Sequence, residues 1–435
     1  MSLVPYGEYI PISLPNVPRL PVGWRLTPLK TVTSCNPEVL PETTAPDHEI
    51  EYIDIASVDG MEGIASTQRL VFADAPSRAR RLVRRGDVII STVRTYLKAV
   101  MRIDHVSSNL IASTGFAVLR PKAGVESAFL GWALQADTFL CDVIARSTGV
   151  SYPSITSSEL ISLPLPLPDP ATQRVIAAFL DRETAKIDAL IAEQERLIAL
   201  LQEKRQAVIS HAVTKGLDRS VPMKESGVLS IGPVPAHWST FRLSRLFRLA
   251  KRQNHPEERV LSVYRDFGVI AKDARDDNMN KTPDDLSVYQ LVEHGDLVIN
   301  KMKAWQGSLG ISQLRGITSP DYAVFRPMHS SNELFLHLLL RCRSMVASYL
   351  SISNGVRLAQ WRIEPDQFLG LTVHLPPIDE QGLIASFVST VETRCEALVG
   401  DATAAVALLR ERRSALITAA VTGQIDVRGL VEVPG

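Results

Sequence analysis

A cluster of basic residues in the first half of the chain has the side chains that bind phosphates and base edges. The 25 residues from Arg78 to Arg102 carry eight basic residues and one acidic residue, Asp87, a local charge of +7 in a chain whose formal net charge is +0. Such a patch suits phosphate contact with counterion release, although a solvated basic surface is the alternative. Its polar tip, residues 91–96, offers donors that could reach base edges. The candidate DNA-binding residues here are Arg84, Arg85, Ser91, Arg94, Tyr96 and Lys98.

The second half of the chain has a corresponding tip, residues 300–306, with different side chains. A second pair of loops, residues 150–154 and 356–361, differs in the same way. Because flanking segments match while the tips differ, we expect the two halves to read different targets. Arg and Asn or Gln can pair bidentately with guanine and adenine edges. The further candidates are Ser151, Tyr152, Asn300, Lys301, Lys303, Trp305, Gln306, Arg357 and Gln360. The acidic segment 256–296 is expected to be a loop that faces away from DNA.

Motifs of catalysis do not accompany these residues. The sequence has no phosphate-binding loop, no Gly-x-Ser-x-Gly elbow and no Gly-x-Gly-x-x-Gly cofactor loop. The segment Leu375–Asp379 lacks the polar first residue and the aromatic last residue of an amino-methyltransferase tetrad. Asp87 and Asp296 each follow Gly at a predicted strand start, which favours a turn role over catalysis. We therefore expect no catalytic residue, no metal ligand and no cofactor on this chain.

Composition indicates a globular protein of several domains. A chain of 435 residues with 45% hydrophobic and 22% charged residues is too long for one ordinary core. The sequence begins without a secretory signal and has no run of 18 apolar residues. The cysteines are scattered without a Cys-x-x-Cys pair, which fits a reducing cytoplasm. They are Cys35, Cys141, Cys342 and Cys395.

An internal repeat with a period of about 208 residues organises the whole chain. Six segments of the first half return in the same order in the second half, at offsets of 206 to 214 residues. The pairs are Leu20–Trp24 with Val234–Trp238, Gly86–Ile90 with Gly295–Ile299, Ala117–Pro121 with Ala323–Pro327, Ser147–Val150 with Ser353–Val356, Leu200–Arg205 with Leu408–Arg413, and Ala212–Thr214 with Ala420–Thr422. A duplication with only structural meaning would give the same matches, so the repeat alone does not define a function.

Each half ends in a long predicted helix, the first from Thr172 to about Val213 and the second from about Glu380 to Thr422. Both have apolar residues at seven-residue spacing and stop at a glycine, Gly216 or Gly423. A helix of about 42 residues spans roughly 60 Å and cannot bury its apolar stripe alone. We predict that the two helices form one antiparallel pair. The alternative is that each packs on its own domain.

The predicted fold class is α+β, with two pseudo-repeated mixed domains separated by two long antiparallel coiled-coil helices. The predicted segments are domain 1 (1–168), the central helix (169–218), domain 2 (219–375), the C-terminal helix (376–427) and a tail (428–435).

Taken together, these features resemble the specificity subunit of type I restriction–modification systems. The resemblance is carried by the helix starts Pro168–Gln173 and Pro376–Gln381, and by the helix ends Lys204–Asp218 and Arg412–Asp426. The Gly-Asp strands, the Ala-Val-x-Arg-Pro blocks and the domain openings Leu20–Leu29 and Val234–Leu243 add to it. The chain departs from the pattern at Thr172, where the second copy has the acidic Glu380.

The resemblance implies a non-catalytic, sequence-specific DNA-binding subunit. Each domain would read one half of a bipartite site in double-stranded DNA, and the helices would set the gap. The helices would also dock two modification (methyltransferase) subunits, which a restriction subunit joins; S-adenosylmethionine, ATP and Mg²⁺ would be needed on those partners only. Val175, Phe179 and Phe387 are candidates for such docking, or else they pack on their own domains.

Three other interpretations stay open at this point. The chain could be a nuclease or methyltransferase with its own DNA recognition, which the missing motifs argue against. It could be a purely structural coiled-coil scaffold, which leaves the divergent tips unexplained. It could also be an orphan or antirestriction DNA-binding protein of the same architecture without active partner subunits.

Overall fold

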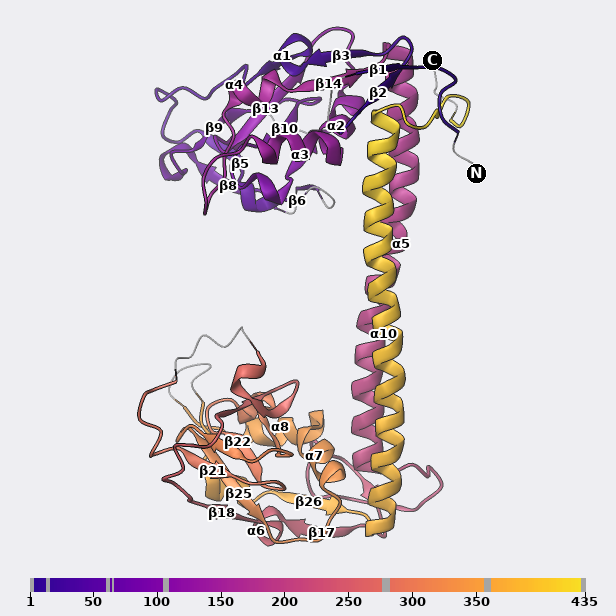
Figure 1. Cartoon of the computed structure of the whole chain (residues 1–435). Helices are drawn as coiled ribbons and strands as arrows, with labels where there is room; N and C mark the ends of the chain where they lie inside the picture. The colour runs from indigo at the N-terminus through magenta and orange to yellow at the C-terminus, as the bar shows by residue number, and fades with distance from the viewer. Residues whose placement is uncertain are drawn as a thin grey trace. The chain divides into compact units, whose positions relative to one another are not determined.

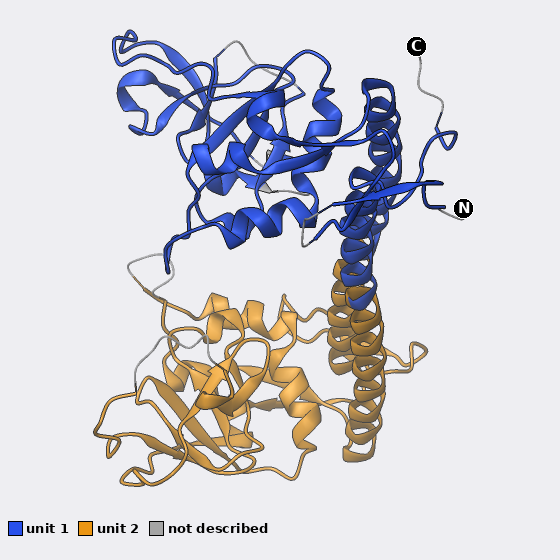
Figure 2. Ribbon diagram, turned by 45° about the horizontal axis from the view of Figure 1, so that its top comes forward, with its two compact units in different colours: residues 1–195, 404–435 blue, residues 196–403 orange. Residues whose placement is uncertain are grey.

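Two units divide the chain in the computed structural model, which describes residues 4–12, 16–59, 63–64, 66–104, 109–275, 282–355 and 361–431. Unit 1 comprises residues 1–195 and 404–435, and unit 2 comprises residues 196–403 (Figure 2). The boundary between the units therefore falls inside both long helices. The sequence-based boundaries treat each helix as a segment of its own and stay a prediction.

The long helices are α5 (Pro170–Lys215) and α10 (Ile378–Val421). The carboxylate of Asp169 accepts hydrogen bonds from the N–H groups of Ala171 (3.0 Å) and Thr172 (3.1 Å), so it caps the start of α5. The helix begins two residues earlier than predicted because proline is well suited to the first helical position. Gly216 and Gly423 follow the two ends with φ of 76° and 71°, the left-handed conformation that ends many helices.

Within each unit the two helices run antiparallel, as predicted (Figure 1). In unit 1, Arg413 pairs with Asp188 at 2.9 Å and Arg410 with Glu195 at 3.0 Å. Residue numbers therefore fall along α10 as they rise along α5. Ile187, Ile191 and Val406 form a small buried cluster beside these pairs. In unit 2, Arg205 pairs with Glu392 at 2.7 Å, while Ile209 and Val213 share a core with Val388 and Ile384. Part of each apolar stripe is thus buried between the helices. Leu190, Leu197 and Leu398 of the same stripes stay exposed.

The domain of unit 1 is built on two four-stranded sheets. Their orders are β11-β10-β13-β4 and β8-β5-β12-β9. The Gly-Asp strand β10 and the Ala-Val-x-Arg-Pro strand β13 lie next to each other and antiparallel, with Val88 opposite Leu119. The elements are β1 (Tyr9–Pro11), β2 (Arg19–Pro21), β3 (Arg25–Pro28), α1 (Leu29–Val32), β4 (Thr33–Cys35), β5 (Glu49–Ile53), β6 (Val58–Asp59), β7 (Gly63–Ile64), β8 (Gln68–Val71), β9 (Ala79–Leu82), β10 (Val88–Ser91), β11 (Val100–Arg102), β12 (Leu110–Ser113), β13 (Phe116–Pro121), α2 (Ser127–Gln135), α3 (Asp137–Ala145), α4 (Ser157–Ser162) and β14 (Pro164–Leu167).

The domain of unit 2 repeats this central sheet in the order β18-β25-β22-β23. Here Val298 lies opposite Val324, as the repeated sequence blocks require. Part of the segment 256–296 forms strands β19, β20 and β21, so the prediction of one long loop is wrong there. The elements are β15 (Met223–Lys224), β16 (Val234–Pro235), β17 (Ser239–Arg242), α6 (Leu243–Leu246), β18 (Phe247–Ala250), β19 (Leu261–Tyr264), β20 (Gly268–Ala271), β21 (Gln290–Val292), β22 (Leu297–Asn300), β23 (Leu309–Ile311), β24 (Gly316–Thr318), β25 (Tyr322–Pro327), α7 (Glu333–Arg341), α8 (Arg343–Ser351), α9 (Pro365–Leu369) and β26 (Thr372–Leu375). The α+β class with two pseudo-repeated domains and two long helices is confirmed.

Each domain core is completed by the beginning of one long helix and the end of the other. In unit 1, Leu180 of α5 and Ala420 of α10 are buried in one cluster with Trp24. In unit 2, Val388 of α10 and Val213 of α5 are buried with Trp238. The helices therefore pair with each other and also pack on the domains, so the two interpretations that the sequence left open describe different parts of the same helices.

The residues proposed for partner docking differ in their exposure. Phe179 is 2% exposed and belongs to the unit 1 core, and Val175 packs against that core. Only Phe387, on α10, stays exposed, at 41%. The first two residues serve packing, because they lie on the face of α5 that the domain covers.

A buried glutamine joins each long helix to its domain. The side-chain NH₂ group of Gln173 donates to the carbonyl of Pro168 (2.9 Å), and its oxygen accepts from the N–H of Glu126 (2.8 Å). Gln381 makes the same bonds with Pro376 (2.9 Å) and Asn332 (2.9 Å). The repeated Gln of the helix starts thus satisfies backbone groups that burial would otherwise leave unpaired.

No single helix in the described part of the chain is long and apolar enough to cross a membrane, and one bent pair, α2 with α3, passes a test of length and composition only.

Replacing Gln173 by Ala should lower the free energy of unfolding by about 1–3 kcal/mol, because it leaves the Glu126 N–H and the Pro168 carbonyl without their partner. Gln202→Ala, at an exposed position of the same helix, should change it by less than about 0.5 kcal/mol. Urea unfolding followed by tryptophan fluorescence measures both. Equal effects of the two variants would contradict the assigned role of Gln173.

Candidate nucleic-acid interface

The tip of unit 1 is a turn that follows β10 and holds two residues in an uncommon backbone conformation. Arg94 (φ 50°) and Lys98 (φ 53°) are left-handed and flank a short 3₁₀ turn, Thr95–Leu97. Non-glycine residues in this region cost energy and concentrate at functional sites. The turn exposes Tyr96 (53%) and Leu97 (50%). The backbone therefore presents these side chains at a fixed place.

A second loop, residues 147–155, packs against this turn. The N–H of Ile155 donates to the carbonyl of Thr92 at 2.9 Å. The guanidinium of Arg94 lies 4.8 Å from the centre of the Tyr152 ring, a cation–π contact. Tyr152 is 66% exposed and Ser151 is exposed beside it. The structure thus brings together four predicted residues from two segments more than fifty residues apart: Arg94, Tyr96, Ser151 and Tyr152.

Lys98 ties this tip to the helix pair. Its ammonium lies 2.8 Å from the carboxylate of Asp137, at the start of α3. The same carboxylate accepts a hydrogen bond from the hydroxyl of Ser414 on α10. Burial opposes ionisation of Asp137, but the hydrogen bonds from Lys98 and Ser414 outweigh it and hold its pKa below the ordinary value. Lys98 therefore positions the turn as well as adding charge to it.

Ser91 does not lie on the exposed surface. It is 3% exposed, and its hydroxyl donates to the carbonyl of Val93 at 2.6 Å. Because its side chain is buried and its hydroxyl is bonded within the turn, we do not propose Ser91 as a DNA contact.

Four of the basic residues between Arg78 and Arg102 form ion pairs with acidic residues that lie outside this stretch of the sequence. The pairs are Arg78 with Asp54 (3.0 Å), Arg84 with Glu38 (2.8 Å), Lys98 with Asp137 (2.8 Å) and Arg102 with Asp104 (2.7 Å). Arg85 is exposed. The net charge of this region is therefore lower than a count along residues 78–102 indicates, because the fold supplies acidic partners from other segments.

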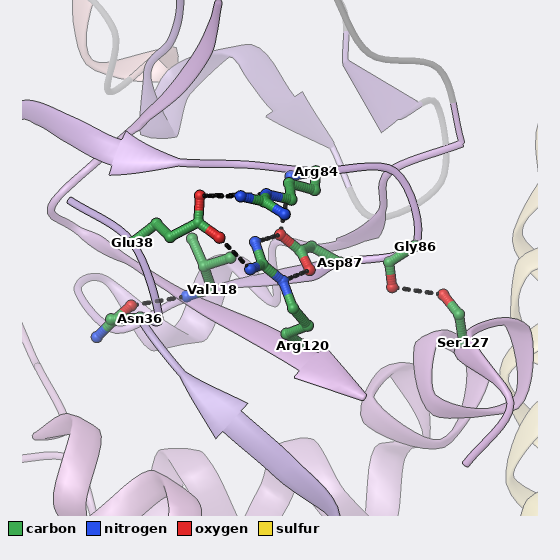
Figure 3. Close-up of polar contacts among 8 residues, drawn as sticks. All are labelled: Asn36, Glu38, Arg84, Gly86, Asp87, Val118, Arg120 and Ser127. Atoms are coloured by element: carbon green, nitrogen blue, oxygen red, sulfur yellow. Dashed lines mark hydrogen bonds and ion pairs between the residues drawn. The ribbon is translucent and has the colours of Figure 1, made fainter. Parts of the chain in front are cut away.

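Asp87 anchors the turn before β10, as its position after Gly86 predicts (Figure 3). It is 1% exposed and binds the guanidinium of Arg120 through both carboxylate oxygens, each at 2.8 Å. It also accepts the N–H of Arg84 at 2.8 Å. The hydrogen bonds to Asp87 raise the pKa of Arg120, and the bond from Arg120 lowers the pKa of Glu38. A buried carboxylate with these partners has a structural role.

Asp296 has the same role in unit 2 with a different arginine. It accepts the N–H of Glu293 at 2.8 Å and pairs with Arg252, which follows β18. Burial raises the pKa of Asp296. Arg326, which matches Arg120 in the sequence repeat, is exposed. The repeat therefore preserves the buried aspartate but exchanges the arginine that neutralises it.

The tip of unit 2 is held by its own side chains. The Asn300 side-chain oxygen accepts the N–H groups of Met302 (3.0 Å) and Lys303 (3.2 Å), which closes the turn. Lys301 is half-buried and donates to the carbonyl of Pro320 at 2.7 Å, and burial lowers its pKa. Lys303 and Gln306 are exposed. Asn300 and Lys301 thus shape the turn, while Lys303 and Gln306 face solvent.

The two tips share one supporting joint. The N–H of Ile363 donates to the carbonyl of Lys301 at 2.9 Å, the counterpart of the bond between Ile155 and Thr92. Trp305 lies 5.6 Å, between ring centres, from Trp361 of the second loop. Arg357 and Gln360 lie outside the described residues. Trp361 is a functional candidate that the prediction omitted, although its loop had been recognised as divergent.

Among the described residues, His, Cys, Asp and Glu side chains form no group of three or more that could hold a metal ion.

Comparisons with known proteins identify one family. The family model of the type I restriction modification DNA specificity domain matches residues 79–199. The StySPI specificity subunit of Salmonella potsdam is 22% identical over 96% of this chain and 92% of its own length. The HindI specificity subunit of Haemophilus influenzae is 30% identical, over 26% of either chain. The match to the StySPI subunit therefore spans nearly the whole chain, and the match to the HindI subunit spans about a quarter of it.

Solved structures show the same fold over most of the chain. A structure described as the basis of complex assembly and conformational transition of the type I R-M system aligns with a TM-score of 0.66 and 24% identity, covering 93% of this chain and 99% of the other. The HsdS subunit of Thermoanaerobacter tengcongensis aligns with a TM-score of 0.51 and 22% identity, covering 93% and 98%. The fold of about nine-tenths of the chain is thus similar to folds already solved.

A histidine of unit 2 lies between helix α7 and strand β23, where its Nδ1 atom is 3.2 Å from the N–H nitrogen of Ile311. His337 on α7 accepts a hydrogen bond from the guanidinium of Arg341 at 2.7 Å. Burial and the neighbouring Arg341 charge lower the pKa of His337 from 6.5 to about 4. Between about pH 4 and pH 6.5, His337 is therefore mostly protonated in the unfolded chain and mostly neutral in the folded chain.

Unit 2 should lose stability as the pH falls from about 6.5 to about 4, by roughly 3 kcal/mol from this group, since each unit of pKa shift corresponds to about 1.4 kcal/mol. His337→Gln keeps an acceptor for Arg341 but cannot be protonated, so it should flatten that part of the pH profile. Urea unfolding of both proteins across pH 4–7 measures the difference. Parallel profiles would contradict the assignment.

Proposed function

Because this chain belongs to the specificity subunits of type I restriction–modification systems, we propose that its two domains each read one half of a bipartite DNA site. The chain recognises DNA sequence and is itself non-catalytic. In the proposal, the long helices set the gap between the half-sites and dock two modification subunits, which a restriction subunit joins. S-adenosylmethionine, ATP and Mg²⁺ would serve those partners.

The observation that carries the proposal is a backbone hydrogen bond that recurs in both units, from Ile155 to Thr92 and from Ile363 to Lys301, beneath two tips with different side chains. In each unit an Ile N–H from the late loop binds the early turn, so two loops form one surface. The side chains at that surface are Arg94 and Tyr152 in unit 1, and Lys303, Trp305 and Gln306 in unit 2. One scaffold with two chemistries fits two half-sites of different sequence.

Exposed apolar residues on the helices support partner docking. On α10, Leu383 (65%), Phe387 (41%) and Leu398 (51%) are spaced by 4 and 11 residues, which places them on one face. An exposed apolar face on a long helix is typical of an interface. A 46-residue helix such as α5 spans about 69 Å, roughly two turns of B-DNA.

Co-expression with modification subunits, followed by mapping of methylation across random DNA, tests the proposal. We expect one split motif with a fixed gap. An orphan or antirestriction protein of this architecture would instead bind DNA while recruiting no active partner. A chain that neither binds DNA nor recruits a partner would refute the proposed function.

Arg94→Ala should relax discrimination in one half-site only, by about tenfold at one or two base pairs, because a lost base contact typically costs about 1–3 kcal/mol. Arg25→Ala removes another exposed arginine of unit 1 and should leave the motif unchanged. Methylation mapping of the assembled complex gives the readout. A uniform loss across all sequences would identify Arg94 as a phosphate contact and contradict base reading.

A further inference from the structure

A β-hairpin of unit 2, outside the predicted tips, presents an exposed phenylalanine. Strands β19 and β20 pair in antiparallel register with Tyr264 opposite Gly268, which leaves a three-residue loop, 265–267. Gly268 has φ of 72°, the left-handed residue that closes such loops. The loop is therefore short and its side chains have defined directions.

Phe267 occupies the tip of this hairpin and is 54% exposed. The guanidinium of Arg275 lies 5.0 Å from the centre of its ring and 5.3 Å from the ring of Tyr264. These cation–π contacts orient the Phe267 ring without covering it. Burial in the core does not explain a large apolar side chain at this position.

The hairpin tip borders the turn that carries Lys303 and Gln306. A Cβ atom placed on Gly307, directly after that turn, would lie 3.6 Å from Cγ of Arg265. The two loops are therefore in contact. Phe267, Arg265 and Lys303 consequently belong to one region of the unit 2 surface. The same loop carries Asp266, whose carboxylate pairs with Arg265 at 3.3 Å, so the region holds one apolar, one acidic and two basic side chains.

A polar cluster beneath the hairpin holds it in place. Arg341 donates a hydrogen bond to the carbonyl of Arg265 and another to His337. The His337 ring lies so close to Gly268 that a Cβ atom there would be 2.9 Å from it. Because α7 supports the hairpin directly, the direction of the tip is fixed by the domain rather than by the loop alone.

We propose that this hairpin enters the major groove of the second half-site and that Phe267 packs against the C5-methyl group of a thymine. The major groove admits a two-stranded β-ribbon, and the thymine methyl is the apolar feature of the base edges there. Lys303 would contact a flanking phosphate, and Arg265 would contact another by exchanging its exposed ion pair with Asp266 for the phosphate. The inference rests on the proposed function and adds a base-specific contact to it.

The experiment uses the full chain assembled with modification subunits and DNA duplexes that carry its mapped site. Each thymine of the second half-site is replaced in turn by deoxyuridine, which lacks only the methyl group. At one position the wild-type complex should lose about tenfold in affinity. The Phe267→Ala complex should bind the normal duplex with a similarly lowered affinity. Deoxyuridine at that position should not lower its affinity further, so the effects of the two changes are not additive.

Two controls separate this contact from general damage. Leu334→Ala, at a 42% exposed apolar residue of α7 in the same unit, should bind both duplexes as the wild type does. Deoxyuridine in the first half-site should affect wild type and Phe267→Ala equally.

Two outcomes would overturn the inference alone. One is a second half-site without thymine. The other is a deoxyuridine effect of the same size in wild type and Phe267→Ala at every position, while the wild type still reads a split site. A wild-type complex that reads no split site would overturn the proposed function and this inference together.

Discussion

The apolar stripe of two helices, each more than forty residues long, is the constraint on which the rest of the structure depends. A single helix of that length cannot bury such a stripe, and the chain supplies its own partner in antiparallel orientation. Each domain core then takes up the start of one helix and the end of the other, beside Trp24 or Trp238. Each domain core therefore includes helix residues that are distant from the rest of the domain in the sequence, such as Ala420 in unit 1.

Duplication explains why the scaffold and the tips behave differently. Buried joints are repeated: the glutamine that links helix to domain, the aspartate beneath the strand turn, and the isoleucine that binds the two loops together. Each satisfies a buried backbone group, and the loss of such a bond costs stability in either copy. The side chains above these bonds have no such requirement. The two loops therefore meet through Arg94 and Tyr152 in one copy and through Trp305 and Trp361 in the other.

The repeat and the heptad spacing predicted the fold class, the helix pair and the position of both tips, because these depend on periodic burial and on turn residues. The sequence did not reveal which tip residues are free to bind. Ser91 is buried and Asn300 closes its own turn, which depends on local hydrogen bonds. It also did not reveal that Glu38 and Asp137 neutralise parts of the basic patch, or that the acidic segment contains the Phe267 hairpin, because these depend on contacts between distant segments.

The central claim is that the helix pair sets the distance between two independent readers. The most direct test inserts one heptad into both helices, after Glu195 and after Thr403, and maps the methylated motif of the assembled complex. Seven residues add about 10 Å of helix, so the account predicts a gap about 3 base pairs wider with both half-sites unchanged. An unchanged gap, or a changed half-site, would contradict it.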